Sequence, residues 1–201
     1  MMRTDILIVL AKTPVYGKVK TRLAAAIGAA AALEIYRRLL RHTLDVAGKV
    51  SSDKVIFYSD EPASDDEIGL GFARATQCEG DLGARMKNAF ANVFGQGYEK
   101  AVMIGTDCPA VGERTLTAAF EALHQHDVVI GPAYDGGYYL LGMKQVHHGL
   151  FDNIPWSTPA VFEETVTICR GNGLRYLLLP TLHDVDKKKD LPQLAKMNQH
   201  G

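Results

Sequence analysis

The sequence is poor in cysteine, with only Cys78, Cys108 and Cys169 among its 201 residues. The number is odd, and no CxxC pair or mixed Cys/His spacing of the kind that binds metal occurs. We therefore predict reduced thiols and no disulfide framework. A structural zinc site is not expected either, because it would need closely spaced pairs of soft ligands.

Long hydrophobic runs are also missing. The apolar run near the start, residues 6–11, follows Asp5 and is shorter than a signal-peptide core or a membrane span requires. We therefore expect a cytoplasmic protein with no membrane partner. The formal net charge is −1, from 22 basic and 23 acidic residues, so the positive surplus that general nucleic-acid binding needs is absent.

The remaining composition is that of a globular domain. Hydrophobic residues make up 47% of the chain and charged residues 22%, which is enough apolar surface for a well-packed core. No internal repeat, low-complexity tract or Pro/Ser-rich linker marks a boundary. Length and continuity therefore predict a single domain over residues 1–201.

Short apolar runs alternate with amphipathic ones along the chain. The predicted strands are bounded by Gly, Pro or Asp and are Asp5–Ala11, Lys54–Ser59, Lys100–Gly105, Asp127–Pro132, Tyr138–Met143 and Leu174–Pro180. Helical spacing predicts helices over Thr21–Ala47, with a break near Gly28, and over Leu82–Phe94, Glu113–His124 and Pro159–Asn172. Continuous apolarity indicates strands covered on both faces, so the pattern predicts a layered α/β domain with a mostly parallel sheet.

Polar segments follow several predicted strands, at the edge where open α/β sheets bind ligands. These segments are residues 12–22, "GTDCPAVG" with Asp107, "PAYDGGY" with Asp135, "HDVDKKKD" with Asp184 and Asp186, and "QCEGDLGARM" with Asp81. Acids, bases and glycines gathered at one edge are costly as packing and useful as a site.

The segment after the first strand is basic, with Lys12, Lys18, Lys20 and Arg22 around Gly17. Glycine lets the backbone approach a ligand, while lysine and arginine supply charge and a bidentate fork for phosphate oxygens. We interpret this segment as a phosphate-binding loop, although its spacing is not that of the Walker motif. The alternative is a surface loop of solvated side chains.

Asp107 ends an apolar strand and is a candidate ligand for a divalent cation that also holds phosphate oxygens. Asp186 is its predicted partner if the two strand ends converge. The alternative role of Asp107 is a helix N-cap or an Asx turn before Pro109. Whether Asp184 or Asp186 supplies the second ligand stays open at this point.

Six motifs in this order and spacing resemble a bacterial family of GT-A-like proteins. They are "KTPVYGKVKTRL", "EGDLGARM", "IGTDCP", "GPAYDGGYYLLGM", "IPWSTPAVFEET" and "HDVDKKKDL". Members of that family are labelled as a domain of unknown function, provisionally as glycosyltransferases, or as radical-SAM- or selenodomain-associated transferases. More distantly, the chain is similar to phospholactate guanylyltransferase, the molybdenum-cofactor guanylyltransferases and the CMP-sugar synthetases.

The resemblance implies a single nucleotide-diphospho-sugar transferase domain with a GT-A, Rossmann-like fold, a mixed but mostly parallel sheet and helices on both faces. It also implies an NTP or NDP-sugar donor and Mg²⁺ or Mn²⁺. Two departures leave the donor unspecified: Lys187–Lys189 replace a Thr-Pro-Glu step, and the lysine loop replaces the glycine-rich opening of sugar nucleotidyltransferases.

Roles for individual residues follow from the same resemblance. Donor phosphates would be held by Lys12, Lys20 and Arg22, with Lys18 in the same loop, and the metal by Asp107 and Asp186. The nucleotide base would lie near Gly80, Asp81, Leu82, Gly83 and Arg85. The acceptor side would be lined by Asp135, Gly136, Gly137, Tyr138, Trp156, Ser157 and Thr158, with Asp107 and Asp135 as the catalytic residues. A plain tight turn at "YDGGYY" and a core position for Trp156 are the alternatives.

We therefore expect a transferase that moves a nucleotidyl group, or a sugar from its nucleotide, to a small-molecule acceptor. A nucleotide-binding module or sensor without turnover is the alternative. Neither the acceptor nor the oligomeric state is indicated by the sequence.

Overall fold

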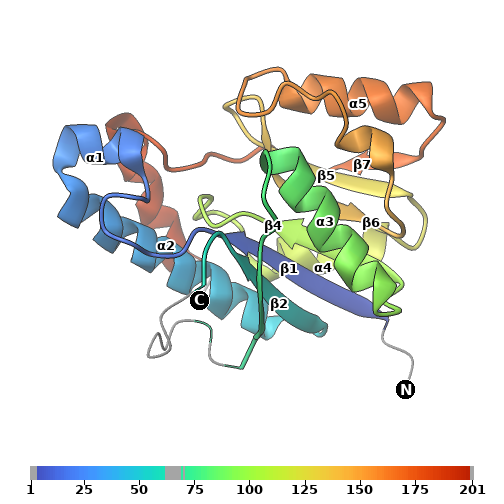
Figure 1. Cartoon of the computed structure of the whole chain (residues 1–201), viewed down its shortest axis with the longest axis horizontal. Helices are drawn as coiled ribbons and strands as arrows, with labels where there is room; N and C mark the ends of the chain where they lie inside the picture. Colours follow the sequence, from blue (N-terminus) through green and yellow to red (C-terminus); the bar gives the residue numbers. More distant parts are fainter. Residues whose placement is uncertain (1–3, 62–68, 70, 200–201) are drawn as a thin grey trace.

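A computed structural model describes residues 4–61, 69 and 71–199 as a seven-stranded sheet with helices on both faces (Figure 1). The strands are β1 (Asp5–Ala11), β2 (Asp53–Tyr58), β3 (Ala73–Thr76), β4 (Lys100–Ile104), β5 (Val128–Pro132), β6 (Tyr138–Met143) and β7 (Tyr176–Leu178). The α-helices are α1 (Thr21–Ile27), α2 (Ala29–Lys49), α3 (Leu82–Gly95), α4 (Glu113–Ala122) and α5 (Val161–Gly171). Two 3₁₀ segments, η1 (His148–Leu150) and η2 (Lys188–Gln199), complete the elements.

The sheet is mixed, and its order is β3-β2-β1-β4-β6-β5-β7. Only β6 runs antiparallel, between β4 and β5, and the other neighbouring strands of the described sheet pair in parallel. The predicted α/β fold with a mostly parallel sheet is confirmed. The edge strand β3 was not predicted, because its four residues "ARAT" are mostly exposed and form no apolar run.

Two hydrophobic cores lie on the two faces of the sheet. On one face, α2 and α4 bury side chains such as Leu40 and Leu116. On the other, α3 and α5 bury Phe90 and Val166. Both faces of the central strands are therefore covered, which is why β1 and β4 read as continuous apolar runs.

The predicted break in the first long helix is confirmed at Gly28, whose φ of 87° separates α1 from α2. A left-handed backbone favours glycine, since other residues pay a steric cost there. The three cysteines, all within the described residues, are free thiols as predicted. Within the same residues, no helix has both the length and the apolarity that crossing a membrane requires.

Candidate functional site

The candidate site lies where the last part of the chain crosses the carboxyl ends of β5 and β4. Leu182 forms a parallel bridge with Ala133, and its N–H donates to the carbonyl of Pro132 at 3.0 Å. Further along, the Val185 N–H donates to the Asp107 carbonyl at 2.8 Å. This path carries the two aspartates of "HDVD" to the end of β4, so the predicted convergence of the strand ends is observed.

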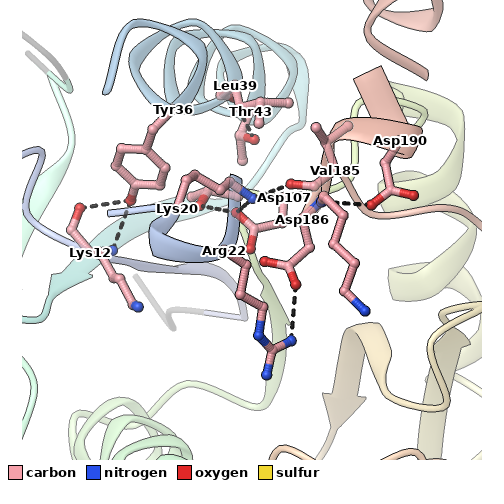
Figure 2. A network of polar contacts seen from close by, with 12 residues as sticks. Lys12, Lys20, Arg22, Tyr36, Leu39, Thr43, Asp107, Val185, Asp186 and Asp190 are labelled. Carbon is pink, nitrogen blue, oxygen red and sulfur yellow. Dashed lines mark hydrogen bonds and ion pairs between the residues drawn. The ribbon is translucent and has the colours of Figure 1, made fainter. Parts of the chain in front are cut away.

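Lys20 is the centre of the site (Figure 2). Its side chain is 3% exposed, and its Nζ donates to the Val185 carbonyl at 2.5 Å and to Asp107 Oδ1 at 2.7 Å. The backbone of Lys20 is left-handed, with φ 48°, a conformation that costs a non-glycine residue about 1–3 kcal/mol. The ion pair and hydrogen bond hold this strained residue in place, so Lys20 is no solvated surface lysine.

Arg22 and Asp186 form the outer half of the same network. Arg22 Nη1 donates to Asp186 Oδ2 at 2.9 Å, and the two side chains are 65% and 36% exposed. An exposed pair of this kind contributes little stability, so its partners can exchange for a ligand at small cost. Asp190 Oδ2 accepts from the N–H groups of Asp186 and Lys187 at 3.2 and 2.7 Å and fixes the turn that presents the Asp186 carboxylate.

The other two basic residues of the loop do not join this network. The Tyr36 hydroxyl accepts from the Lys12 N–H at 2.8 Å and donates to the Lys12 carbonyl at 2.7 Å. Burial raises the pKa of Tyr36, so its hydroxyl stays protonated and can keep donating. The structure thus anchors the backbone of Lys12 and leaves its side chain exposed, as is that of Lys18.

Four carboxylates share this edge of the sheet. The pKa of Asp184 is raised to about 7, mainly by burial and also by the charges of Asp107, Asp135 and Asp186, while Lys20 acts to lower it. The alternative role of Asp107 as a helix N-cap is wrong, because α4 begins at Glu113 behind the N-cap Gly112.

The turn that carries Asp135 is tight and packed. Asp135 Oδ1 accepts from the Gly137 N–H at 2.9 Å, which leaves Oδ2 outside this bond. Gly136 has φ 90°, and a Cβ atom there would collide with the backbone of Pro159. The Gly136 carbonyl accepts from the Phe162 N–H at 2.9 Å. The close approach that Gly136 permits is therefore to Pro159; "YDGGYY" forms a tight turn, and its place on the acceptor side stays a prediction.

Trp156 links the predicted acceptor and base segments. Its ring meets Tyr138 edge-on, with centroids 6.5 Å apart, and it covers Gly83 so closely that a Cβ atom there would collide with the indole. Both aromatic rings pack against the core beneath α3 and α5. Burial raises the pKa of Tyr138 well above its usual value. Trp156 and Tyr138 thus pack against the core while remaining partly buried, and their predicted place on the acceptor side stays a prediction.

The remaining predicted residues of these segments hold local turns. Asp81 is the N-cap of α3 and accepts from the Ala84 N–H at 2.8 Å, while Arg85 Nε donates to the Gly80 carbonyl at 3.0 Å. Leu82 at the start of α3 is 41% exposed. Ser157 adopts φ 64°, and the Thr158 hydroxyl donates to the Pro155 carbonyl at 2.7 Å.

Tyr134, which stacks on His183 at the site, was missed by the sequence reasoning. The rings of Tyr134 and His183 stack with centroids 3.9 Å apart and planes 15° from parallel. Tyr134 is nevertheless 64% exposed. The available signal was position, because each residue directly precedes a carboxylate of the site, Asp135 and Asp184 respectively.

The carboxylates fit a hard divalent cation only in combination with a ligand. Among the described residues, no group of three or more His, Cys, Asp and Glu side chains is placed to hold a metal ion. Mg²⁺ is commonly bound by one or two carboxylates that are completed by phosphate oxygens and water. The oxygens of Asp107 and Asp186 match that chemistry, with Lys20 and Arg22 now serving as their counter-charges.

A mixed α/β sheet with such a site after β1 and β4 is the architecture of nucleotide-diphospho-sugar transferase folds. The chain belongs to a bacterial family described as "Uncharacterized protein conserved in bacteria (DUF2064)", whose model matches residues 43–158. It is also 30% identical to a Desulfovibrio desulfuricans G20 protein provisionally named a nucleotide-diphospho-sugar transferase. That similarity covers 97% of this chain and 94% of the other, with a TM-score of 0.86.

Two more distant structures share the fold. CMP:2-keto-3-deoxy-manno-octonic acid synthetase, solved with CTP, is 11% identical over 98% of this chain and 99% of its own, with a TM-score of 0.63. Rv0371C from Mycobacterium tuberculosis H37Rv, solved with manganese, is 16% identical over 95% and 98%, with a TM-score of 0.57. No curated protein matches the sequence significantly.

Proposed function

We propose that the protein is a transferase that takes an NTP or an NDP-sugar as donor and moves the nucleotidyl group or the sugar to a small-molecule acceptor. One observation carries this proposal: Lys20 and Arg22 meet Asp107 and Asp186 at the carboxyl edge of the sheet. Cations for phosphate oxygens and carboxylates for a metal are thereby combined in one place.

The donor phosphates would contact the exposed cations of the loop. Arg22 offers a planar fork that can bind phosphate oxygens through two parallel hydrogen bonds, while Lys12 and Lys18 supply point charges. The nucleotide base would lie toward the start of α3, where Leu82 is the exposed apolar side chain. Lys20, already buried against Asp107, would hold the end of β4 in position beneath the phosphates.

A divalent cation, Mg²⁺ or Mn²⁺, would be held by Asp107 with Asp186. When bound it would neutralise charge on the donor phosphates. The similar proteins support this proposal by the CTP and manganese that their structures contain. Asp184 lies two residues before Asp186 on the same segment, and exchange of each aspartate for asparagine would separate their contributions.

Asp135 would act on the acceptor. Its Oδ2 atom lies outside the bond to the Gly137 N–H and can take a proton from an acceptor hydroxyl. In nucleotidyl transfer the acceptor oxygen bonds to the α-phosphorus, the α–β phosphoanhydride bond breaks, and pyrophosphate leaves with the electron pair. In sugar transfer the acceptor oxygen bonds to the anomeric carbon, the bond between that carbon and the β-phosphate oxygen breaks, and a nucleoside diphosphate leaves with the electron pair. Either way the acceptor's proton passes to Asp135.

A screen of NTPs and NDP-sugars with and without Mg²⁺ tests the proposal. Thermal unfolding reports binding, since a ligand well above its Kd raises stability by a few kcal/mol. Pyrophosphate release in the presence of an acceptor mixture identifies nucleotidyl transfer, and nucleoside diphosphate release identifies sugar transfer. Metal-dependent binding with neither product would favour the non-catalytic module, and absence of nucleotide binding would contradict both.

A further inference from the structure

Exposed apolar side chains gather around the candidate site. Among the described residues, the large hydrophobic side chains with more than a third of their surface exposed are Val15, Tyr16, Leu82, Tyr134 and Leu178. All but Leu178 lie in segments that follow the carboxyl ends of β1, β3 and β5, at the same edge of the sheet as the carboxylates. Apolar surface left in water at one place marks where a ligand is expected to cover it.

Tyr134 is the member of this set that is held in place. Its N–H donates to the Leu182 carbonyl at 3.0 Å, and one face of its ring is covered by the parallel ring of His183. With 64% of the residue exposed, the stack contributes little as core packing. The stack instead provides a flat aromatic surface that is already oriented, so ordering it on ligand binding costs little entropy.

Carboxylates adjoin this surface along the chain. Asp135 and Asp184 directly follow the two stacked residues in the sequence. The nearest cations of the network, Lys20 and Arg22, are paired with Asp107 and Asp186. A phosphate or carboxylate group placed on the stack would meet carboxylates without a counter-charge, whereas hydroxyl groups could donate to them.

We propose that Tyr134 and His183 form the floor of the acceptor subsite and that the acceptor is an uncharged polyhydroxylated ring, a sugar or a cyclitol. The C–H face of such a ring packs on the tyrosine, and its hydroxyls donate to Asp135 and Asp184. The word acceptor rests on the proposed transferase function. The binding of a neutral hydroxylated ring does not, and it is measured without nucleotide.

The test measures ring binding to the full chain by saturation-transfer NMR and calorimetry. The probes are methyl glucoside, methyl galactoside and myo-inositol, each compared with its phosphorylated counterpart. At least one neutral ring is expected to bind about tenfold more tightly than its phosphorylated form, a difference of about 1.4 kcal/mol. Y134A should weaken that ring about tenfold, whereas Y134F, which keeps the aromatic face, should stay within about threefold.

A control variant and a folding check show whether a loss of ring binding is specific to Tyr134. L178A removes an apolar side chain of β7 that is 44% exposed and should leave ring binding unchanged. Thermal unfolding of every variant checks the fold. Binding of no neutral ring, preference for the phosphorylated forms, or equal affinity of Y134A and the wild type would each overturn the subsite. Tyr134-dependent ring binding in a protein that binds no nucleotide would instead leave the subsite standing and reject the transferase.

Discussion

The Lys20 ammonium is a buried charge that depends on one carboxylate. Its Nζ lies 2.7 Å from Asp107 Oδ1 and reaches no bulk water, since the side chain is 3% exposed. Removing one partner of a buried pair costs more than the pair itself contributes, because the other charge is then left uncompensated. Asp107 therefore also stabilises the fold, by compensating the charge of Lys20.

D107N should lower the free energy of unfolding by about 2 kcal/mol, less than for a fully buried pair because the carboxylate is 47% exposed. It should also abolish Mg²⁺-dependent nucleotide binding. The double variant K20M/D107N also removes the uncompensated ammonium. It should regain much of the stability but none of the metal dependence. Urea unfolding and calorimetry with and without Mg²⁺ measure the two effects. A D107N protein with normal Mg²⁺-dependent affinity would reject the metal site.

The exposed cations of the loop offer a cleaner test of phosphate binding than Lys20 does. K18A/R22A should weaken triphosphate or diphosphate ligands by about 2–3 kcal/mol and leave the bare nucleoside nearly unaffected, because two charge-assisted contacts are lost. R38A, which removes an exposed arginine of α2, is the control. Equal losses for nucleoside and nucleotide would show that the loop acts through folding.

Helix α3 is fastened to the rest of the site by contact between Gly83 and the Trp156 ring. G83A should destabilise the protein by about 1–3 kcal/mol, because the added methyl group has no space beneath the indole. G95A changes the same helix at its last residue, where no atom lies within reach, and should be neutral or stabilising by up to about 1 kcal/mol. Chemical unfolding of both variants compares them, and equal effects would contradict the close packing.

Strands β5 and β7 are joined at their start by a charge contact that depends on pH. The Arg175 backbone N–H donates to Asp127 Oδ2 at 3.0 Å, and the Arg175 and Lys144 side chains face Oδ1. These contacts lower the pKa of Asp127 to about 2, while burial lowers the pKa of the neighbouring His147. Because the folded carboxyl has the lower pKa, its contribution is present above the unfolded pKa and lost as the pH falls.

The expected consequence is a stability difference between the wild type and D127N of about 1 kcal/mol at pH 6, reduced from the full shift because solvent screens these pairs. The difference should shrink as the pH falls from about 4 toward 2, where the wild-type carboxyl becomes protonated. Urea unfolding at a series of pH values measures it. A difference that stayed constant down to pH 2 would assign the effect of D127N to something other than this ionisation.

Most elements could be predicted because their residues carry the pattern themselves. β1, β4 and β6 are runs buried on both faces, and Gly28 marks the helix break by its backbone freedom. β3 could not be predicted, since an exposed edge strand of four residues is defined only by its pairing with β2. Elements that bury apolar surface are specified by their local sequence, whereas an exposed strand such as β3 depends on its pairing within the sheet.

The same distinction applies to the candidate site: part of it could be predicted from the sequence and part of it depends on the folded chain. The convergence of the basic loop with Asp107 and Asp186 could be predicted, because strand ends meet at one edge of a parallel sheet. The burial of Lys20 and the stacking of Tyr134 on His183 could not, since both depend on the path that residues 182–185 take across the ends of β5 and β4. No residue pattern encodes that path.

Ligand binding should therefore slow amide hydrogen exchange along residues 182–185. With an NTP and Mg²⁺ bound, the amide protons of Leu182 and Val185, which donate to Pro132 and Asp107, should exchange at least about tenfold more slowly. Amides in the middle of β1 should change only with global stability. Native-state hydrogen exchange resolves both groups. Equal slowing at all positions would mean that the ligand does not act through the crossing segment.

The contact between Lys20 and the Val185 carbonyl joins residues 165 positions apart. During synthesis at about 5–20 residues per second, Lys20 leaves the ribosome about 8–33 s before Val185 does. Through that interval the ammonium has no carbonyl to donate to, and the carboxylates of Asp184 and Asp186 do not yet exist. A nascent chain can thus fold much of its sheet before the proposed cation site is complete.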